Sequence, residues 1–290
     1  MRKFFILLNP ASGQIDKYKL QKQIEAYLAE KGIEFECFQT ERKKHATQLV
    51  SELLTPDFTD ILVVGGDGTL NEVVNGLRNT QIPISIIPKG TGNDFAKALK
   101  LPKKLNQQLE IALNGKVKSV DVGKCNSHLF INTMGFGFDG KVVEHMEQNG
   151  KPAGGHLAYI LTVLKIVTAF PEPTVKFKVD GKEFEQPVFL MAINNGTVYG
   201  GGFHITPDAK LDDGIFDICL IGKISPIRRL INFPKMQLGI HQNVREIQML
   251  QGREIEISAN PKVLAQLDGE LIGAPPFKVS ILEKYLKFRC

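Results

Sequence analysis

The chain has 290 residues, of which 43% are hydrophobic and 23% are charged, and its formal net charge is +5. This composition is that of an ordinary soluble globular protein with room for one large or two ordinary domains. The charge is modest, and we expect no nucleic-acid partner.

The four cysteines are far apart and show no C-x-x-C pairing, which argues against a zinc site or a disulfide framework and for a reducing compartment. The apolar run Phe4–Leu8 is too short for a secretory signal. The longest apolar segment, Leu157–Phe170, contains Lys165 and falls short of the roughly 20 residues that a membrane span requires. We therefore expect a cytoplasmic protein with no membrane crossing.

Basic residues form several short clusters. Any one of them is more typical of a solvated face than of a binding site, but such clusters also attract phosphorylated ligands or an anionic membrane surface. The clusters are Arg42–Lys44, Lys97 to Lys104, Arg228 and Arg229 with Lys235, and Lys284 to Arg289.

The first part of the chain alternates strands and helices. This alternation with short loops predicts a doubly wound parallel sheet in an α/β domain. The expected strands are Phe4–Leu8, Glu34–Gln39, Ile61–Val64 and Ile84–Ile87, and the main expected helices are Asp16–Lys31, His45–Leu54, one beginning near Gly68 and Leu105–Asn114.

A glycine-rich turn follows the third of these strands. Gly65, Gly66 and Gly68 have no Cβ, so a ligand can approach the backbone N–H groups at the start of the next helix. Asp67 lies among them and would be tolerated beside an anion only with a metal ion or a hydrogen-bonding cation. The turn therefore predicts a nucleotide phosphate with magnesium. A simpler reading makes Thr69 and Glu72 a capping box, and we expect them to act as caps in either case.

Three other segments fall at the same edge of the predicted sheet. In a parallel sheet the ligand loops gather at the carboxyl ends of the strands. Asn9–Gly13, Thr40 and Gly90–Asp94 each follow a strand, as Gly65–Asn71 does. Four loops that converge there favour a binding site more strongly than one.

After about residue 115 the pattern changes to short strands joined by hairpin turns such as Asp180-Gly181 and Asp268-Gly269. We expect residues 119–290 to form a mainly antiparallel β-sandwich, with helices near Gly155–Ala169 and Ser225–Phe233, and residues 1–118 to form the α/β domain. About ten residues at the C-terminus are expected to pack on the first domain. Gly135–Asp139 is typical of a β-bulge and carries no functional weight alone.

The glycine and acid motifs, taken in order, resemble the bacterial diacylglycerol kinase family, which is related to sphingosine and ceramide kinases. The resemblance covers essentially the whole chain. It implies an NAD kinase/phosphofructokinase-like first domain and a β-sandwich that binds the lipid. The motifs are Asn9-Pro10-x-Ser12-Gly13, Gly65-Gly66-Asp67-Gly68-Thr69-x-Asn71-Glu72, Gly90 to Ala96, Asp121-Val122-Gly123, Asp213-Gly214 and Asp268-Gly269-Glu270.

The resemblance also implies roles for individual residues. Asp67 and Asp94 match acids that organise catalytic Mg²⁺, and Glu270 matches the proposed general base on the lipid hydroxyl. A second, structural metal site maps to Lys210, Asp213 and Ile215. Gln14 replaces a basic residue of many relatives, and Lys17 and Lys89 are candidates to substitute for it. The positions that match ATP contacts are Asn9, Pro10, Ser12, Gly13, Thr40, Gly65, Gly66, Asp67, Gly68, Thr69, Leu70, Asn71 and Thr91.

The expected function is an ATP-dependent lipid kinase of phospholipid metabolism that acts on diacylglycerol at the inner face of the membrane, to which it binds peripherally. The alternatives are a kinase for phosphatidylglycerol or a sphingoid base, an NAD kinase-type phosphotransferase, and a non-catalytic nucleotide-binding protein. The sequence leaves a homodimer open.

Overall fold

The computed structural model describes residues 2–13, 16–78, 81–150, 155–258 and 263–290. The chain divides into two compact units. The first comprises Met1–Val122 with Glu283–Cys290, and the second comprises Gly123–Leu282. Within the described ranges, no helix combines the length and the apolar character that a bilayer crossing requires.

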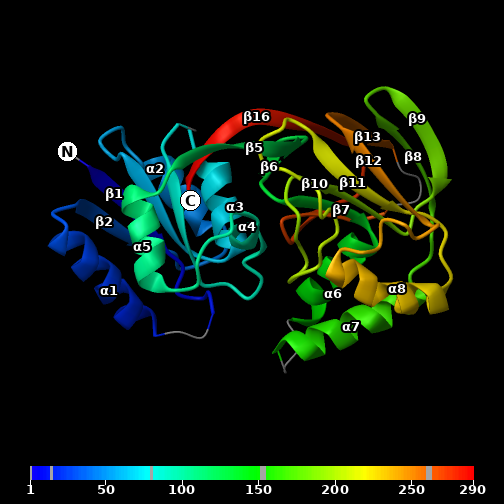
Figure 1. Cartoon of the computed structure of the whole chain (residues 1–290), viewed down its shortest axis with the longest axis horizontal. Coiled ribbons are helices and arrows are strands. Elements are labelled where there is room, and N and C mark those ends of the chain that lie inside the picture. The colour runs from blue at the N-terminus through cyan, green and yellow to red at the C-terminus, as the bar shows by residue number, and fades with distance from the viewer. Residues whose placement is uncertain (1, 14–15, 79–80, 151–154, 259–262) are drawn as a thin grey trace. The chain divides into compact units, whose positions relative to one another are not determined.

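The first unit is built on four parallel strands. They lie in the order β2-β1-β3-β4 (Figure 1), so the chain winds in both directions from β1. The central strands are buried on both faces, as the expected runs of apolar, mostly β-branched residues require. The bounds are β1 Lys3–Leu8, β2 Glu34–Gln39, β3 Asp60–Gly65 and β4 Ile84–Pro88.

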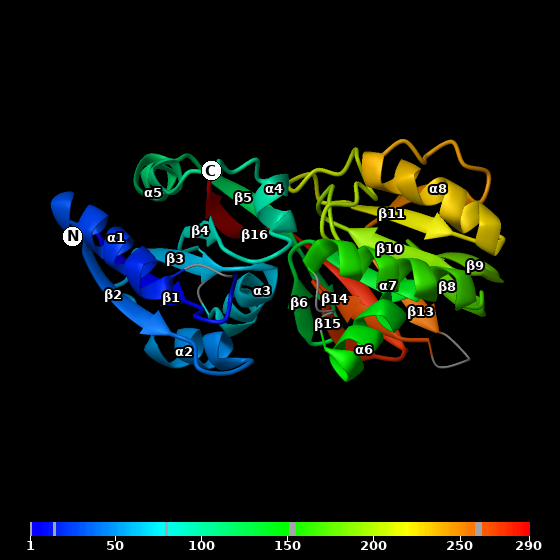
Figure 2. The ribbon, with the colours of Figure 1, turned by 90° about the horizontal axis from the view of Figure 1, so that it is seen from below.

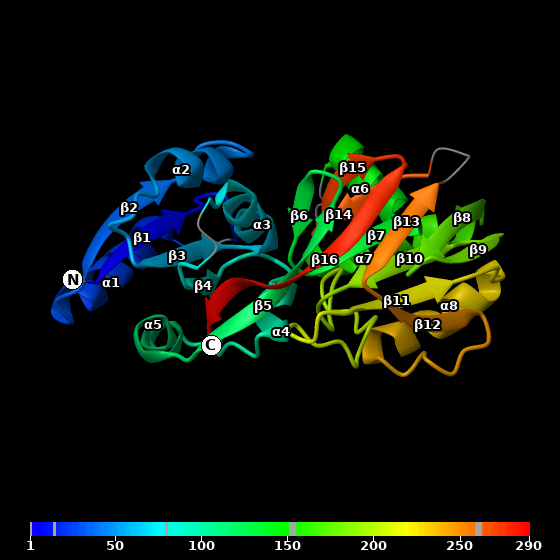
Figure 3. The ribbon, with the colours of Figure 1, turned by 90° about the horizontal axis from the view of Figure 1, so that it is seen from above.

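Helices cover both faces of this sheet, which confirms the doubly wound fold. Figures 2 and 3 show α1 (Lys17–Glu30) and α5 (Leu105–Asn114) on one side, with α2 (His45–Leu53) and α3 (Asp67–Gly76) on the other. Alternate side chains of β1 pack with α1 and α5 in one hydrophobic cluster. A short helix, α4 (Asp94–Ala98), follows β4.

Glu72 has a different role from the one expected. The helix begins at Asp67, so Thr69 and Glu72 lie inside it and form no capping box. The carboxylate of Glu72 instead accepts hydrogen bonds from the backbone N–H groups of Lys44 (2.9 Å) and Ala46 (3.0 Å), at the start of α2. Glu72 therefore caps the neighbouring helix. The capping-box prediction is wrong because the pattern was assigned to the wrong helix.

The end of the chain is tied into the first unit. Strand β16 (Phe277–Arg289) runs parallel to β4 at Phe288. Arg289 and Arg2 both form ion pairs with the buried Asp60, at 2.9 and 2.8 Å. The backbone N–H of Lys284 donates to Asp121.

The second unit is a sandwich of two sheets. One carries the order β16-β13-β8-β9, and the other the antiparallel order β12-β11-β10-β7-β14-β15. Inward side chains from both sheets, among them Phe177, Phe136 and Ile218, form one core cluster. The bounds are β5 Val117–Cys125, β6 His128–Phe130, β7 Thr133–Gly137, β8 Thr174–Val179, β9 Lys182–Pro187, β10 Leu190–Asn194, β11 Phe216–Ile221, β12 Ile247–Gly252, β13 Glu254–Ser258, β14 Ala265–Leu267 and β15 Glu270–Gly273.

Three helices pack on the outer face of the second sheet. They are α6 (Phe138–Asn149), α7 (Gly155–Ala169) and α8 (Pro226–Leu238), seen along the lower edge of Figure 1. Because side chains alternate along a strand, Met191 points into the sandwich while Leu190 packs under these helices. Helix α6 and strands β12 and β15 were not expected from the sequence, and α8 continues beyond the predicted end through Pro234.

The position of Glu72 leads to a test. We expect Glu72→Ala to lower the free energy of unfolding by about 1–2 kcal/mol, because two N–H groups at the start of α2 lose their acceptor. Glu30→Ala, a change at an exposed carboxylate near the end of α1, should change it by less than about 0.5 kcal/mol. Urea denaturation of both variants measures the difference. Equal stabilities would contradict the capping role.

Candidate functional site

Three loops of the first unit meet at the carboxyl ends of its strands. The amide of Asn9, after β1, donates to the hydroxyl of Thr69 at 2.8 Å. The backbone N–H of Lys89, after β4, donates to the carbonyl of Gly65 at 2.7 Å. These bonds join the loops that follow β1, β3 and β4.

Glycine is required where these loops touch. A Cβ on Gly66 would lie 2.9 Å from the Cα of Gly90, and a Cβ on Gly90 would lie 2.6 Å from the Cα of Gly66. Gly13 has a φ of +70°, and a Cβ there would lie 2.4 Å from the carbonyl oxygen of Lys89. The three loops therefore approach more closely than residues with side chains allow. Around Gly68, by contrast, the space is open.

Asp67 connects two of the loops. Its carboxylate accepts hydrogen bonds from the backbone N–H groups of Asp94 (3.1 Å) and Phe95 (3.2 Å). Burial raises the pKa of Asp67, and the negative charge of Asp94 raises it further, while the two N–H bonds oppose this. Asp94 is buried and pairs with the ammonium of Lys97 at 2.9 Å. A pair of carboxylates in such a setting favours a bound cation.

Two lysines stand at the same edge of the sheet. The Nζ atom of Lys17 is buried and has no hydrogen-bond partner among the described residues. A Cβ on Gly13 would lie 3.8 Å from this atom, so the ammonium is beside the first loop. Burial lowers the pKa of Lys17, and burial and the charge of Lys17 lower the pKa of Lys89. An anion beside these lysines would offset both effects.

These features together suit a phosphorylated ligand with a divalent cation. The N-cap residue of α3 is Gly66, which has no side chain to bond the first N–H groups of the helix, so an anion can approach them. The orphaned Lys17 ammonium supplies positive charge, and Asp67 and Asp94 supply oxygen ligands of the type that Mg²⁺ prefers. The residues present therefore fit the expected ATP and Mg²⁺.

The other candidate residues of the first unit lie at or near this edge. The N–H of buried Thr40 continues the sheet by donating to Leu8. Pro10 and Thr91 are exposed, and Ser12 is half-buried. Leu70 and Asn71 are buried in α3, and the N–H of Leu70 donates to Gly66. Gln14 lies outside the described residues.

Glu270 belongs to the second unit, where it begins β15 after a two-residue turn. Asp268 and Gly269 have φ values of +46° and +90°, as a type I′ turn requires. The Asp268 carboxylate accepts bonds from the N–H groups of Ile131, Asn132 and Thr133 at 2.7–3.0 Å. Glu270 therefore extends from a rigid hairpin.

The residues expected to hold a second metal ion lie in one loop before β11. Asp213 is exposed, and it accepts a hydrogen bond from the N–H of Ile215 at 3.3 Å. The charges of Asp213 and Asp208 add to burial in raising the pKa of Asp217. No group of three or more acidic, histidine or cysteine side chains in the described part of the chain is arranged to hold a metal.

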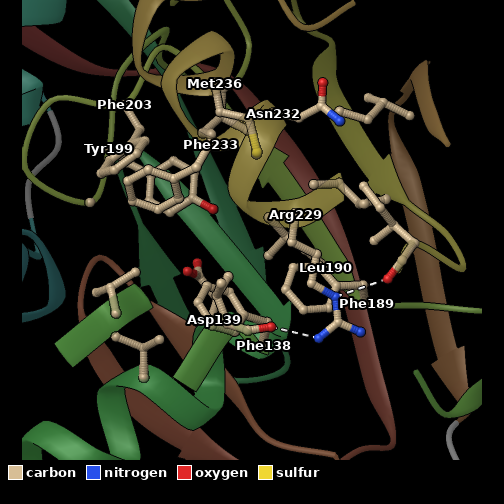
Figure 4. Close-up of a pocket in the computed structure, with 18 residues that line it drawn as sticks. Phe138, Asp139, Phe189, Leu190, Tyr199, Phe203, Arg229, Asn232, Phe233 and Met236 are labelled. Atoms are coloured by element: carbon tan, nitrogen blue, oxygen red, sulfur yellow. Dashed lines mark hydrogen bonds between the residues drawn. The ribbon is translucent and has the colours of Figure 1, made fainter. Parts of the chain in front are cut away.

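A mainly apolar pocket lies between the second sheet and helices α6, α7 and α8. The empty space in it, together with the open solvent at its mouth, is about 700 Å³. Figure 4 shows aromatic side chains around it, with Asp139 directed toward the cavity. Arg229 closes one side, where its guanidinium donates to the carbonyls of Val167 and Ile224 and pairs with Glu172. The wall also includes Phe138, Phe189, Tyr199, Phe203, Phe233 and Met236.

Among the described residues that line this pocket, Asp139 carries the one carboxyl group. Burial raises its pKa to about 6, although hydrogen bonds from Gln266 and Tyr199 oppose the shift. The amide of Gln266 donates to Asp139 at 3.0 Å, and its carbonyl oxygen accepts from the N–H of Gly269 at 2.7 Å. One side chain thus links the pocket to the hairpin that carries Glu270.

Sequence reasoning missed this pocket. The glycine–acid segment Gly135–Asp139 is the one feature noted in the sequence that could have indicated an acid at this pocket. A Cβ on Gly135 would lie 1.8 Å from a carboxylate oxygen of Asp139, so this glycine makes room for the acid. The basic cluster that contains Arg229 did not indicate a pocket, because the tertiary fold alone brings Arg229 and Tyr199 to the cavity.

The raised pKa of Asp139 predicts a pH dependence. The folded state prefers the neutral acid, so its contribution to stability is present below pH 4 and is lost as the pH rises through 6. We expect Asp139→Asn to increase the free energy of unfolding by about 1–2 kcal/mol at pH 8, and the gain to disappear near pH 4. Urea denaturation across this range measures it, with exposed Asp212→Asn as the control. A gain that is independent of pH would contradict the assignment.

Both units match known protein families. Residues 3–125 match the diacylglycerol kinase catalytic domain, and residues 132–289 match the YegS C-terminal NAD kinase beta sandwich-like domain. A diacylglycerol kinase from Bacillus subtilis is 30% identical over 280 residues, which cover 95% of this chain and 92% of that protein. One from Staphylococcus carnosus is 28% identical over 97% of this chain and 93% of its own length.

Solved structures agree. A diacylglycerol kinase from Bacillus anthracis str. Sterne has a TM-score of 0.81 and 28% sequence identity, with 99% of this chain and 96% of that chain covered. These matches confirm the α/β domain followed by a β-sandwich, and they do not favour the alternative kinases. The chain belongs to the diacylglycerol kinase family.

Proposed function

We propose that this protein transfers the γ-phosphoryl group of ATP to the free hydroxyl of diacylglycerol, which yields ADP and phosphatidic acid. Membership of the family implies a kinase that uses ATP. The choice of diacylglycerol rests on the names of the relatives and on the apolar pocket of the second unit.

The observation that carries the proposal is the junction of glycine turns around Asp67. Phosphoryl transfer depends mainly on positioning and on neutralising charge. The N-terminus of α3, which begins after Gly66, would position a triphosphate, and the Lys17 ammonium would neutralise part of its charge. A Mg²⁺ ion held by Asp67 and Asp94 would neutralise further charge on the phosphates when bound.

In the proposed reaction, the second unit binds the lipid and supplies the general base. The apolar pocket suits acyl chains, and the carboxyl group of Asp139 offers one polar contact for a glycerol oxygen. Glu270 serves as the general base that accepts the proton of the lipid hydroxyl as the new P–O bond forms. The hairpin bonds of Asp268 and the Gln266 link hold its backbone in place.

Two further elements belong to the proposal. The protein acts in the cytoplasm, peripherally at the inner face of the membrane, because its substrate resides in the bilayer. A structural metal ion would be held by the loop that contains Lys210, Asp213 and Ile215, with the Asp213 carboxylate as its charged ligand. Burial raises the pKa of Asp217, and the negative charges of Asp213 and Asp208 add to this shift, so acidic charge near the loop supports a cation there.

The direct test is transfer from radiolabelled ATP to a panel of acceptors: diacylglycerol, phosphatidylglycerol, sphingosine, ceramide and NAD. We expect label in phosphatidic acid with diacylglycerol, and Mg²⁺-dependent turnover. Label in another acceptor alone, or in none of the lipids in mixed micelles, contradicts the proposal.

Two variants test the assigned roles. We expect Asp67→Asn and Glu270→Gln each to lower kcat by about 10²–10⁴-fold, because one loses a metal ligand and the other the proton acceptor. Exposed Asp212→Asn and Glu256→Gln are matched controls and should retain near-normal turnover. Circular dichroism establishes that all four fold. A folded Asp67→Asn or Glu270→Gln variant with normal kcat removes the role of that residue.

A further inference from the structure

Helix α8 carries apolar side chains on the side that faces solvent. Ile227, Ile231 and Leu238 are 71%, 62% and 69% exposed, and Leu230 is 42% exposed. Ile240, just after the helix, is 63% exposed. We call these five residues the outer stripe.

The outer stripe lies opposite the buried face of the same helix. Arg229, Asn232, Phe233 and Met236 point inward and line the apolar pocket. With about 100° between successive residues of a helix, Ile227, Ile231 and Leu238 project from the other side. They recur at steps of four and seven residues, so they form one continuous row.

Such a row is unusual on a helix that already packs against a sheet. A surface helix normally presents polar residues on the face opposite its core contacts. A row of exposed Leu and Ile instead marks a surface that contacts another apolar phase. The stripe therefore needs an occupant.

The charges around the stripe identify the kind of occupant. From Lys223 to Arg245 the sequence has no Asp or Glu, whereas it has five basic residues. Lys223, Arg228 and Lys235 are exposed, and Arg228 also pairs with Glu246. An apolar row bordered by lysine and arginine matches the interface of an anionic bilayer. There the lipid acyl chains contact the apolar residues, and the anionic head groups attract the basic residues.

We propose that the outer stripe of α8 rests in the surface of an anionic membrane. The inference rests on the proposed function, because diacylglycerol is drawn from that membrane. It deepens the proposal because the same helix lines the apolar pocket with its inner face, so docking brings the pocket wall to the bilayer. At about 20 Å in length, α8 lies along the interface and does not cross it.

Vesicle sedimentation tests the apolar contribution. We expect the triple variant Ile227→Gln, Ile231→Gln, Leu238→Gln to bind vesicles of equal parts phosphatidylglycerol and phosphatidylcholine on the order of 100-fold more weakly than the unaltered protein. The control is Tyr18→Gln with Leu53→Gln, which changes exposed apolar residues of α1 and α2. Its binding should remain within about twofold. Equal binding by the triple variant and the unaltered protein overturns the proposal.

A second variant tests the charge. Lys235→Gln should weaken binding to the anionic vesicles about fivefold and leave binding to pure phosphatidylcholine unchanged. An equal loss on both kinds of vesicle contradicts an electrostatic role. Analytical ultracentrifugation without lipid tests whether a second copy of the chain contacts the outer stripe instead. If the unaltered protein is a dimer and the triple variant is a monomer, a second copy covers the stripe and the membrane proposal is overturned.

Activity separates this inference from the proposed function. With short-chain diacylglycerol below its aggregation concentration, the triple variant should turn over normally, because its altered residues do not line the pocket. With long-chain diacylglycerol in vesicles it should lose activity in proportion to binding. If the unaltered protein phosphorylates neither substrate, the proposed function fails, and vesicle binding still decides the role of the stripe.

Discussion

The close approach of Gly66 and Gly90 is the constraint on which the first unit's site depends. Neither position has room for a Cβ, and the contact places the loop after β3 against the loop after β4. Asp67 then reaches the N–H groups of Asp94 and Phe95. The close approach of Gly13 to the Lys89 carbonyl brings the loop beside Lys17 to the same edge of the sheet. Asp67 and Asp94 are like charges close together, and under the proposed function a metal ion bound with a triphosphate would relieve their repulsion.

The second unit also holds buried ionisable groups, but these lie at an apolar pocket. Asp139 sits in a pocket where burial keeps its pKa near 6, and Arg229 is buried among carbonyls and Glu172. Burial of such groups lowers the stability of the fold relative to that of a well-packed apolar core. Helix α8 closes this pocket with one face and exposes Ile227 and Ile231 on the other. Under the proposed function, an apolar substrate drawn from a membrane would account for both faces.

Much of the first unit could be predicted from the sequence because its signals are local. Apolar runs such as Ile61–Val64 predicted its strands, and in the second unit Asp268-Gly269 likewise predicted a hairpin turn. Glu72 was misassigned because its partners, Lys44 and Ala46, are distant in sequence. Helix α6 was missed because it begins directly after a strand at Gly137, without a capping side chain. The pocket could not be predicted, since its walls come from elements that are separate in sequence. The exposed face of α8 could not be predicted either, because a helix with apolar residues on both faces resembles a buried core helix.

Amide hydrogen exchange with and without ATP and Mg²⁺ tests directly whether the glycine loops of the first unit bind the nucleotide, because it reports on backbone N–H groups. We expect slower exchange at Gly66–Thr69, at Asn9–Gly13 and at Lys89–Phe95 when the nucleotide binds, with the sheet of β10 and β11 unchanged. Binding of ATP that leaves these three loops unprotected, or protects the apolar pocket instead, would contradict it.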